Sequence, residues 1–279
     1  WIFETGVIDF AGGTAVHINA GAAALALAIV IGKRTGWPKT PMRPHNLTLV
    51  MIGAGLLWFG WFGFNAGSAL AADNTSAVVF LNTFAATCAA AIGWLVVEKL
   101  RDGHITTLGA ASGIVAGLVA ITPACSAVSP IGALIVGILA GVICALAVGL
   151  KYRFGYDDSL DVVGVHLVGG LLGTLLIGFL ATDLAPAGVN GLLYGGGGEQ
   201  LGKQAIGAFS VMGYSFVVAL IIGLILRAAG IMRVSRDEEL SGIDLAEHAE
   251  SAYEFGETGG GGHFAGIGAG AARRDREEI

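Results

Sequence analysis

Charged residues are scarce in this chain of 279 residues, because Asp, Glu, Lys and Arg together make up only 13% of it. A soluble domain carries about 25%, so the shortage excludes an ordinary soluble globular protein. Cysteine is also rare, and no CxxC pair occurs among Cys88, Cys125 and Cys144. We interpret the three as small packing residues, which excludes a disulfide framework and a cysteine-based metal site.

What the chain has instead is apolar sequence: 54% of its residues are hydrophobic, 46 are glycine, and the mean hydropathy is +0.75. Seven apolar runs are long enough, or nearly so, to cross a hydrocarbon layer of roughly 30 Å as helices. They are residues 15–31, 47–64, 77–97, 108–121, 131–150, 162–181 and 205–226. The fourth run is short for a span. The pattern predicts an all-α polytopic membrane protein.

Basic residues cluster in alternate gaps between these runs. The clusters are Lys33, Arg34, Lys39 and Arg43; Lys99 and Arg101; Lys151 and Arg153; and Arg227, Arg233 and Arg236. The intervening gaps hold only Lys203. By the positive-inside rule, residues 1–9 face out and the C-terminus is cytoplasmic. We therefore expect a multi-pass protein of the cell membrane. The net charge of −6 comes mostly from acidic residues outside the runs, and nothing in the sequence indicates a nucleic-acid partner.

An Asp-x7-His spacing occurs twice, each time at the start of an apolar run: Asp9 precedes His17, and Asp158 precedes His166. Eight residues of helix rise about 12 Å, which would place both histidines near the middle of the hydrocarbon layer. The first helix runs inwards and the second runs outwards. Matched units in antiparallel helices predict an inverted-topology repeat with its functional site at the midplane.

The repeat also predicts the domain organisation. Asp9 would begin the last span of a first repeat, and residues 47–181 would form a complete five-span second repeat. About four spans would then precede the chain, which begins with Trp rather than Met, so we expect about seven of eleven spans to be present. We expect a transport domain over residues 1–228, a cytoplasmic segment over 229–255, and a disordered tail over 256–279.

The paired histidines are the main candidates for function. Ionisable groups at membrane depth usually face a bundle interior or a water path, and two facing neutral imidazoles can share a hydrogen bond. Such a pair could line a path, bind a small polar molecule or relay a proton. Metal binding would need a third ligand at the same depth, and none stands in a matched position. We expect no metal and no cofactor.

An aromatic motif, GWFGFNAGSA at residues 60–69, ends the second run. Trp61 and Phe64 could present ring faces to a small cation, with the Ser68 hydroxyl as a nearby acceptor. An interfacial aromatic belt explains the same residues equally well. A potassium-type site would use rings of backbone carbonyls, and no such filter sequence is present.

The carboxylates of the repeated units have two readings. Asp9 could bind a cation at the outer mouth, or it could cap its helix by bonding the backbone N–H groups of Ala11 to Gly13. The cap is the favoured interpretation, with attraction of cations as a by-product. Asp158 or Asp161 would have the matching structural role on the inner side.

The motifs DFAGGTAVHINAG (9–21), GWFGFNAGSA and DVVGVH (161–166) resemble the ammonium transporter family, which includes the fungal and Rhesus-type proteins. The resemblance covers nearly the whole chain to about Phe255. It implies an eleven-span homotrimer with one pore per subunit. In that family ammonium is recruited and deprotonated at an outer aromatic site, and ammonia passes a hydrophobic pore lined by twin histidines.

By motif, the resemblance implies that Ser68 belongs to the recruitment site, Phe64 to the gate below it, and His17 and His166 to the twin pair. Asp9 matches the acidic residue needed for transport. The family's recruiting tryptophan and second gate phenylalanine lie upstream of residue 1, because Trp1 is too close to Asp9 to be that tryptophan. The resemblance also implies that a PII-type signalling protein blocks the inner mouth at the polar tail.

The sequence thus predicts a transporter of ammonium, with methylammonium as an analogue, rather than an enzyme. A bare ammonium ion crosses an apolar pore only at high cost, whereas neutral ammonia does not. Net charge transport and electroneutral gas conduction both remain open. The rival hypotheses are an ammonium sensor that uses the same pore and a membrane metalloenzyme built on the two histidines.

Overall fold

The computed structural model describes residues 1–40, 42–251 and 253, and the regular structure in this part of the chain is helical apart from one isolated bridge between Val128 and Ala181. The chain divides into two units, the first Trp1–Arg233 and the second beginning at Val234. The second unit contains two short helices, α9 (Arg236–Ser241) and α10 (Ile243–His248). The expected disordered tail over 256–279 lies outside the described residues.

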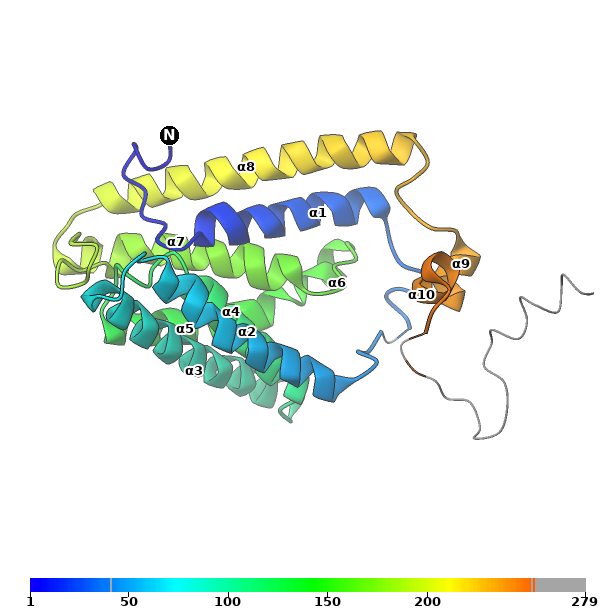
Figure 1. Cartoon of the computed structure of the whole chain (residues 1–279), viewed down its shortest axis with the longest axis horizontal. Helices are drawn as coiled ribbons and strands as arrows, with labels where there is room; N and C mark the ends of the chain where they lie inside the picture. Colours follow the sequence, from blue (N-terminus) through cyan, green and yellow to red (C-terminus); the bar gives the residue numbers. More distant parts are fainter. Residues whose placement is uncertain (41, 252, 254–279) are drawn as a thin grey trace, which may run out of the picture. The chain divides into compact units, whose positions relative to one another are not determined.

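The first unit is a bundle of apolar helices (Figure 1). Its elements are the π-helical turn η1 (Gly13–Ile18), α1 (Asn19–Ile31), α2 (Leu47–Gly67), α3 (Asn74–Asp102), α4 (Thr107–Ile121), α5 (Pro130–Ala147), α6 (Leu150–Phe154), the π-helical turn η2 (Val163–Leu167), α7 (Val168–Leu180), the 3₁₀ turn η3 (Leu192–Tyr194) and α8 (Glu199–Ala228). Within the described ranges, six helices are long and apolar enough to cross a membrane, and α4 is a shorter apolar helix. Each of the seven apolar runs therefore corresponds to a helix, which confirms the predicted all-α polytopic architecture.

Two helices, α3 and α8, extend furthest beyond their apolar runs. A capping box between Asp73 and Ser76 starts α3, and the helix continues to Asp102. Its last turn contains Lys99 and Arg101, and positive charges at a helix C-terminus interact favourably with the helix dipole. The helix α8 begins at Glu199, six residues before the predicted run. An apolar-run criterion misses this start, because it does not count the polar first turn of a helix.

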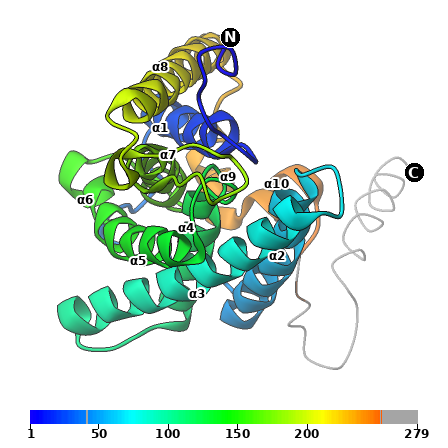
Figure 2. The same cartoon turned by 90° about the vertical axis from the view of Figure 1, so that its left-hand side faces the viewer.

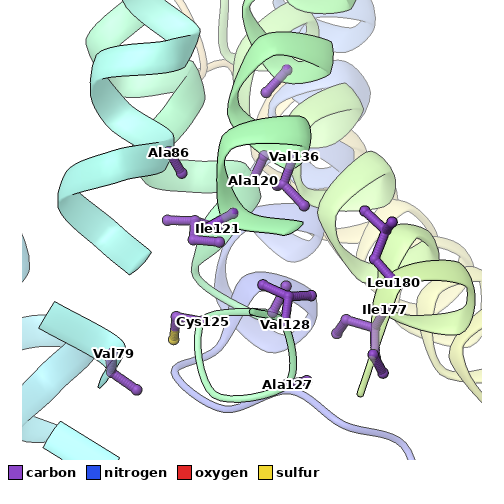
Figure 3. Close-up of a cluster of buried hydrophobic side chains, with 14 residues drawn as sticks. Val79, Ala86, Ala120, Ile121, Cys125, Ala127, Val128, Val136, Ile177 and Leu180 are labelled. Carbon is purple, nitrogen blue, oxygen red and sulfur yellow. The ribbon is translucent and has the colours of Figure 1, made fainter. Parts of the chain in front are cut away.

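The helices α3, α4 and α5 pack into one block, where small residues let the backbones approach closely. A Cβ atom added at Gly137 or Gly141 of α5 would overlap the backbone of α3 at Ala86 or Ala90. A buried apolar cluster from α3, α4, α5, α7 and the loop after α4 fills the space between them (Figure 3). This block supports the helices that carry the candidate site.

The segments that bear the two histidines run antiparallel and in contact. Thr14 contacts Thr174 through their hydroxyls, Ile18 packs on Gly170, and Gly21 packs on Leu167. As the residue number rises in the first segment, its partner's number falls, which is the pairing expected of an inverted repeat. The helix α8 packs along α1 and α7 (Figure 2). This arrangement sets the position of both imidazoles.

Candidate functional site

The two histidines of the Asp-x7-His units meet inside the bundle. His17 Nδ1 lies 3.2 Å from His166 Nδ1, and the ring centroids are 5.3 Å apart. Each histidine lies in a π-helical turn, η1 or η2, rather than in regular α-helix. Such turns are rare and occur frequently at functional sites. The sequence did not predict them, but it did predict the pairing of the rings.

The expected helical rise from Asp9 to His17 is wrong. Helix begins only at Gly13, four residues after Asp9, because Gly12 turns the backbone at a φ of 96°. A positive φ of this kind favours glycine over residues with a side chain. His17 therefore lies close to the start of its helix, and its position comes from the antiparallel partner segment rather than from eight residues of regular helix.

Two aromatic rings of α2 pack on His17. The Trp61 ring stacks on the imidazole with centroids 5.3 Å apart and an interplanar angle of 13°, and the Phe64 ring approaches it edge-on at 6.3 Å. The Trp61 indole N–H donates to the hydroxyl of Thr122, at 2.8 Å. The structure thus brings Trp61 and Phe64 to the histidine pair, and Trp61 is held there by a hydrogen bond to the end of α4.

His17 has one nitrogen with no partner. Its Nε2 atom is buried and makes no hydrogen bond to any described residue, while Nδ1 faces His166. Buried polar atoms are normally paired. The unpaired nitrogen lies on the same ring that Trp61 covers, so this ring has hydrogen-bonding capacity that the described residues do not use.

A depression of about 370 Å³ contains Asp9 and Ser68, and Ser126 and Phe10 are also part of its lining. The Ser68 hydroxyl donates to the backbone carbonyl of Phe64 at 2.8 Å, which leaves its oxygen able to accept. The structure therefore brings Asp9 and Ser68 together at one mouth of the bundle. Trp61 and Phe64 do not line this depression, so the aromatic motif divides between the mouth and the histidine pair.

The Asp9 carboxylate caps the first histidine segment, chiefly through amides further along the chain than expected. It accepts hydrogen bonds from the backbone N–H groups of Thr14 and Ala15, both at 2.9 Å. Of the predicted partners Ala11 to Gly13, Ala11 is wrong, because its N–H already donates to the carbonyl of Thr122, whereas the backbone groups of Gly12 and Gly13 also interact with the carboxylate. Burial raises the pKa of the Asp9 carboxyl, against the opposing effect of these backbone bonds.

Asp158 has the matching position in the second unit. Its carboxylate accepts from the backbone N–H groups of Val162 and Val163 at 3.0 and 2.7 Å. Asp161 makes a different contact, an ion pair with Lys151 at 2.6 Å. Burial raises the pKa of Asp161, and the bond from Lys151 opposes this shift. Of the two inner candidates, Asp158 is thus the one whose side chain caps the helix start.

Several buried polar residues that support the site were not predicted. Thr122 donates to Asn65, which in turn donates to Thr83, so polar side chains connect α2, α3 and α4 behind Trp61. Only Thr83 lies within a predicted apolar run, whereas Asn65 and Thr122 directly follow the ends of theirs, so the three share no signal in the sequence. No group of three or more His, Cys, Asp or Glu side chains in the described ranges could hold a metal ion, and the histidine pair alone offers only two ligands.

Comparison with known proteins places this geometry in one family. The model of the Ammonium Transporter Family matches residues 1–253. An ammonium transporter of Mycobacterium tuberculosis is 64% identical over 254 residues, which cover 89% of this chain and 53% of that protein. An ammonium transporter of Bacillus subtilis is 44% identical over 256 residues, covering 91% of this chain and 63% of that protein. The chain thus spans about half the length of the first of these relatives.

Solved structures agree with the sequence relatives. The crystal structure of Mep2 from Candida albicans superposes with a TM-score of 0.79 at 36% identity, covering 85% of this chain and 55% of that one. A structure described as a sensor Amt protein superposes with a TM-score of 0.80 at 35% identity, covering 88% of this chain and 62% of that one. The fold, the sequence relatives and the family model agree, and the chain belongs to the ammonium transporter family.

Proposed function

We propose that the protein containing this chain transports ammonium across a membrane through a hydrophobic pore lined by His17 and His166. The observation that carries the proposal is the contact between the two imidazoles, 3.2 Å apart at their Nδ1 atoms and covered by Trp61, in a bundle of apolar helices. Membership of the ammonium transporter family supports ammonium as the substrate, with methylammonium as an analogue.

The chemistry divides between the mouth and the pore. The charged carboxylate of Asp9 attracts cations to the depression that it shares with Ser68, and Phe64 lies between Ser68 and the histidine pair. Ammonium loses its proton before the apolar section, because an unpaired charge in an apolar medium costs far more than a neutral molecule. Ammonia then passes beside the imidazoles.

The imidazole pair suits a small neutral base with hydrogen-bonding groups. Each neutral ring has one donor and one acceptor nitrogen, so one shared hydrogen bond between the Nδ1 atoms leaves an Nε2 atom on each ring for the passing molecule or a proton. On His17 this Nε2 atom is buried without a protein partner. The pair can therefore hold ammonia in single file and offer a route for the released proton.

We extend the proposal to the assembly. The protein acts as a homotrimer in the cell membrane. Residues 1–228 belong to its transport domain, and residues 229–255 form a cytoplasmic segment. A PII-type signalling protein binds at the cytoplasmic face. The support is the family match over residues 1–253 and the alternating distribution of basic residues.

The test is uptake by the protein expressed from its complete coding sequence and reconstituted into vesicles. We expect saturable uptake of labelled methylammonium that ammonium inhibits and potassium at the same concentration does not. Empty vesicles are the control. Equal uptake by protein-containing and empty vesicles would overturn the proposal.

An ammonium sensor is the second candidate, because the fold also matches the sensor Amt protein over 88% of this chain. A sensor binds ammonium at the same site without transporting it at a useful rate. Saturable ammonium binding by the purified protein, together with no uptake in the vesicle assay, is the result that favours a sensor over a transporter.

A further inference from the structure

Two glutamines on one face of α8 hold the extended segment that precedes Asp9. Gln204 is fully buried. Its Oε1 atom accepts from the backbone N–H of Ile8 at 2.7 Å, and its Nε2 atom donates to the carbonyl of the same residue at 2.7 Å. Gln200, one turn earlier, donates to the carbonyl of Gly6 at 3.1 Å. The side chains thus pair with the segment as a neighbouring strand would.

The Gln204 amide is saturated with hydrogen bonds. Besides the two bonds to Ile8, its Nε2 donates to the carbonyl of Thr174 at 3.2 Å and its Oε1 accepts from Gln200 Nε2 at 2.9 Å. A primary amide has two donor hydrogens and two acceptor lone pairs, so all four are used. A saturated amide fixes geometry tightly, because every displacement leaves a buried polar group unpaired.

This amide reaches Asp9 by two routes. The first is the chain itself, because Ile8 is the residue before Asp9. The second runs through Thr174, whose hydroxyl lies 2.8 Å from the hydroxyl of Thr14, and the Thr14 N–H donates to the Asp9 carboxylate. Gln204 therefore holds the residue next to the carboxylate and, through Thr174, contacts the residue that supplies one of the N–H groups bonded to it.

The location of Gln204 is informative as well. Most of α8 is poorly buried, because only 11% of an 18-residue apolar stretch of this helix is buried. Near Gln204 the contact is close: Gly207, one turn later, would place a Cβ atom 2.9 Å from Val7. The helix α8 is thus closely packed where it meets residues 6–8.

We propose that Gln204 is a positioning residue for Asp9, which orients that carboxylate at the mouth of the bundle through Ile8 and Thr174. The inference rests on the proposed function, in which Asp9 belongs to the entry of the transport route. Gln204 does not contact the transported molecule, and it acts only through the segment that it holds.

The test replaces Gln204 by Met, which keeps the length of the side chain and removes all four hydrogen bonds. Amide hydrogen exchange is measured by mass spectrometry on the membrane-reconstituted protein from the complete coding sequence. Loss of a buried hydrogen bond changes an equilibrium by roughly tenfold. We expect exchange of the peptide containing Thr14 and Ala15 to accelerate by about that factor, with α3 and α4 unchanged. Ser210→Ala, an exposed polar position on the same helix, is the matched control and should match wild type.

Asp9→Asn separates positioning from a general structural role. It should accelerate the same peptide, and the double variant should exchange no faster than Asp9→Asn alone, because both changes release one contact. Acceleration spread over the whole bundle, additive effects in the double variant, or no change in Gln204→Met would each overturn the proposal. If Gln204→Met yields no folded protein, Gln200→Met is measured in its place. We then expect a smaller acceleration of hydrogen exchange in the peptide containing Thr14 and Ala15.

Uptake of methylammonium per folded protein is measured on the same samples. We expect Gln204→Met to lower it by about tenfold and Ser210→Ala to leave it unchanged. If the wild-type protein shows no uptake, the proposed function is overturned, and the hydrogen-exchange result still tests the positioning role of Gln204. If Gln204→Met shows normal uptake and its Thr14 peptide is as protected from exchange as in wild type, the positioning role is overturned and the proposed function is not.

Discussion

The contact between α1 and η2 offers a sharp test of how the histidine pair is positioned. Gly21 lies one turn after His17, and Leu167 directly follows His166. A Cβ atom at Gly21 would overlap the backbone N and Cα atoms of Leu167. Backbone atoms cannot move aside as the end of a flexible side chain can, so Gly21→Ala must push the two segments apart.

The required displacement can be estimated from ordinary contact distances. Carbon atoms in favourable contact lie about 3.5 Å or more apart, so the segments must separate by about 1 Å. The Nδ1 atoms of His17 and His166 are already 3.2 Å apart, at the upper end of hydrogen-bonding distance, and this displacement breaks their bond. Overpacking of this kind costs about 1–3 kcal/mol of folding free energy, which an apolar bundle of this size tolerates.

We therefore expect Gly21→Ala to fold and to lose transport. Uptake of methylammonium per folded protein should fall by about tenfold or more, since displacements of about 1 Å at a functional site commonly have effects of this size. Gly213→Ala is the matched control, because nothing lies within 4 Å of the Cβ atom that it adds to α8. Equal uptake by Gly21→Ala and Gly213→Ala would refute the reasoning.

Two further predictions concern stability. Thr122→Val removes the hydroxyl that binds the Trp61 indole and should lower the free energy of unfolding by about 1–3 kcal/mol. Thr122→Ser keeps the hydroxyl and should melt at a temperature close to that of wild type. An unchanged melting temperature in Thr122→Val contradicts this. Burial disfavours the charged form of Asp157, but the hydrogen bonds and the charge of Arg34 outweigh it and hold the pKa of Asp157 below its ordinary 3.8. The unfolded chain then binds more protons, so the stabilisation is complete above that value and is lost as the pH falls through the lower pKa of the folded form. Wild type should exceed Asp157→Asn in melting temperature at neutral pH, and the difference should narrow as the pH falls below 3.8. A difference in melting temperature that does not change with pH contradicts this.

Much of the fold follows from local sequence. Each apolar run predicts its helix, because a membrane leaves a backbone few other ways to satisfy its hydrogen bonds. The ends of the helices do not follow so directly. Gln204 lies just before the predicted run at 205–226, and its burial depends on the contact between α8 and the distant residue Ile8.

The candidate site divides in the same way. The pairing of His17 with His166 was predicted because the Asp-x7-His spacing repeats in antiparallel segments. The π-helical turns, the stacking of Trp61 on His17 and the bond from Trp61 to Thr122 have no local signal. Each depends on residues from distant helices, as does the absence of Ala11 from the Asp9 cap, because the Ala11 N–H donates to the carbonyl of Thr122.

The measurement that tests the central claim most directly is ammonium-dependent current and methylammonium flux in reconstituted protein carrying His17→Ala or His166→Ala. The control is His104→Ala, an exposed histidine in the loop after α3. We expect each pore variant to change current and flux strongly, with the double variant close to the single ones because the pair acts as a unit, and the control to match wild type. Currents and flux unchanged in both single variants would contradict a pore lined by the two histidines.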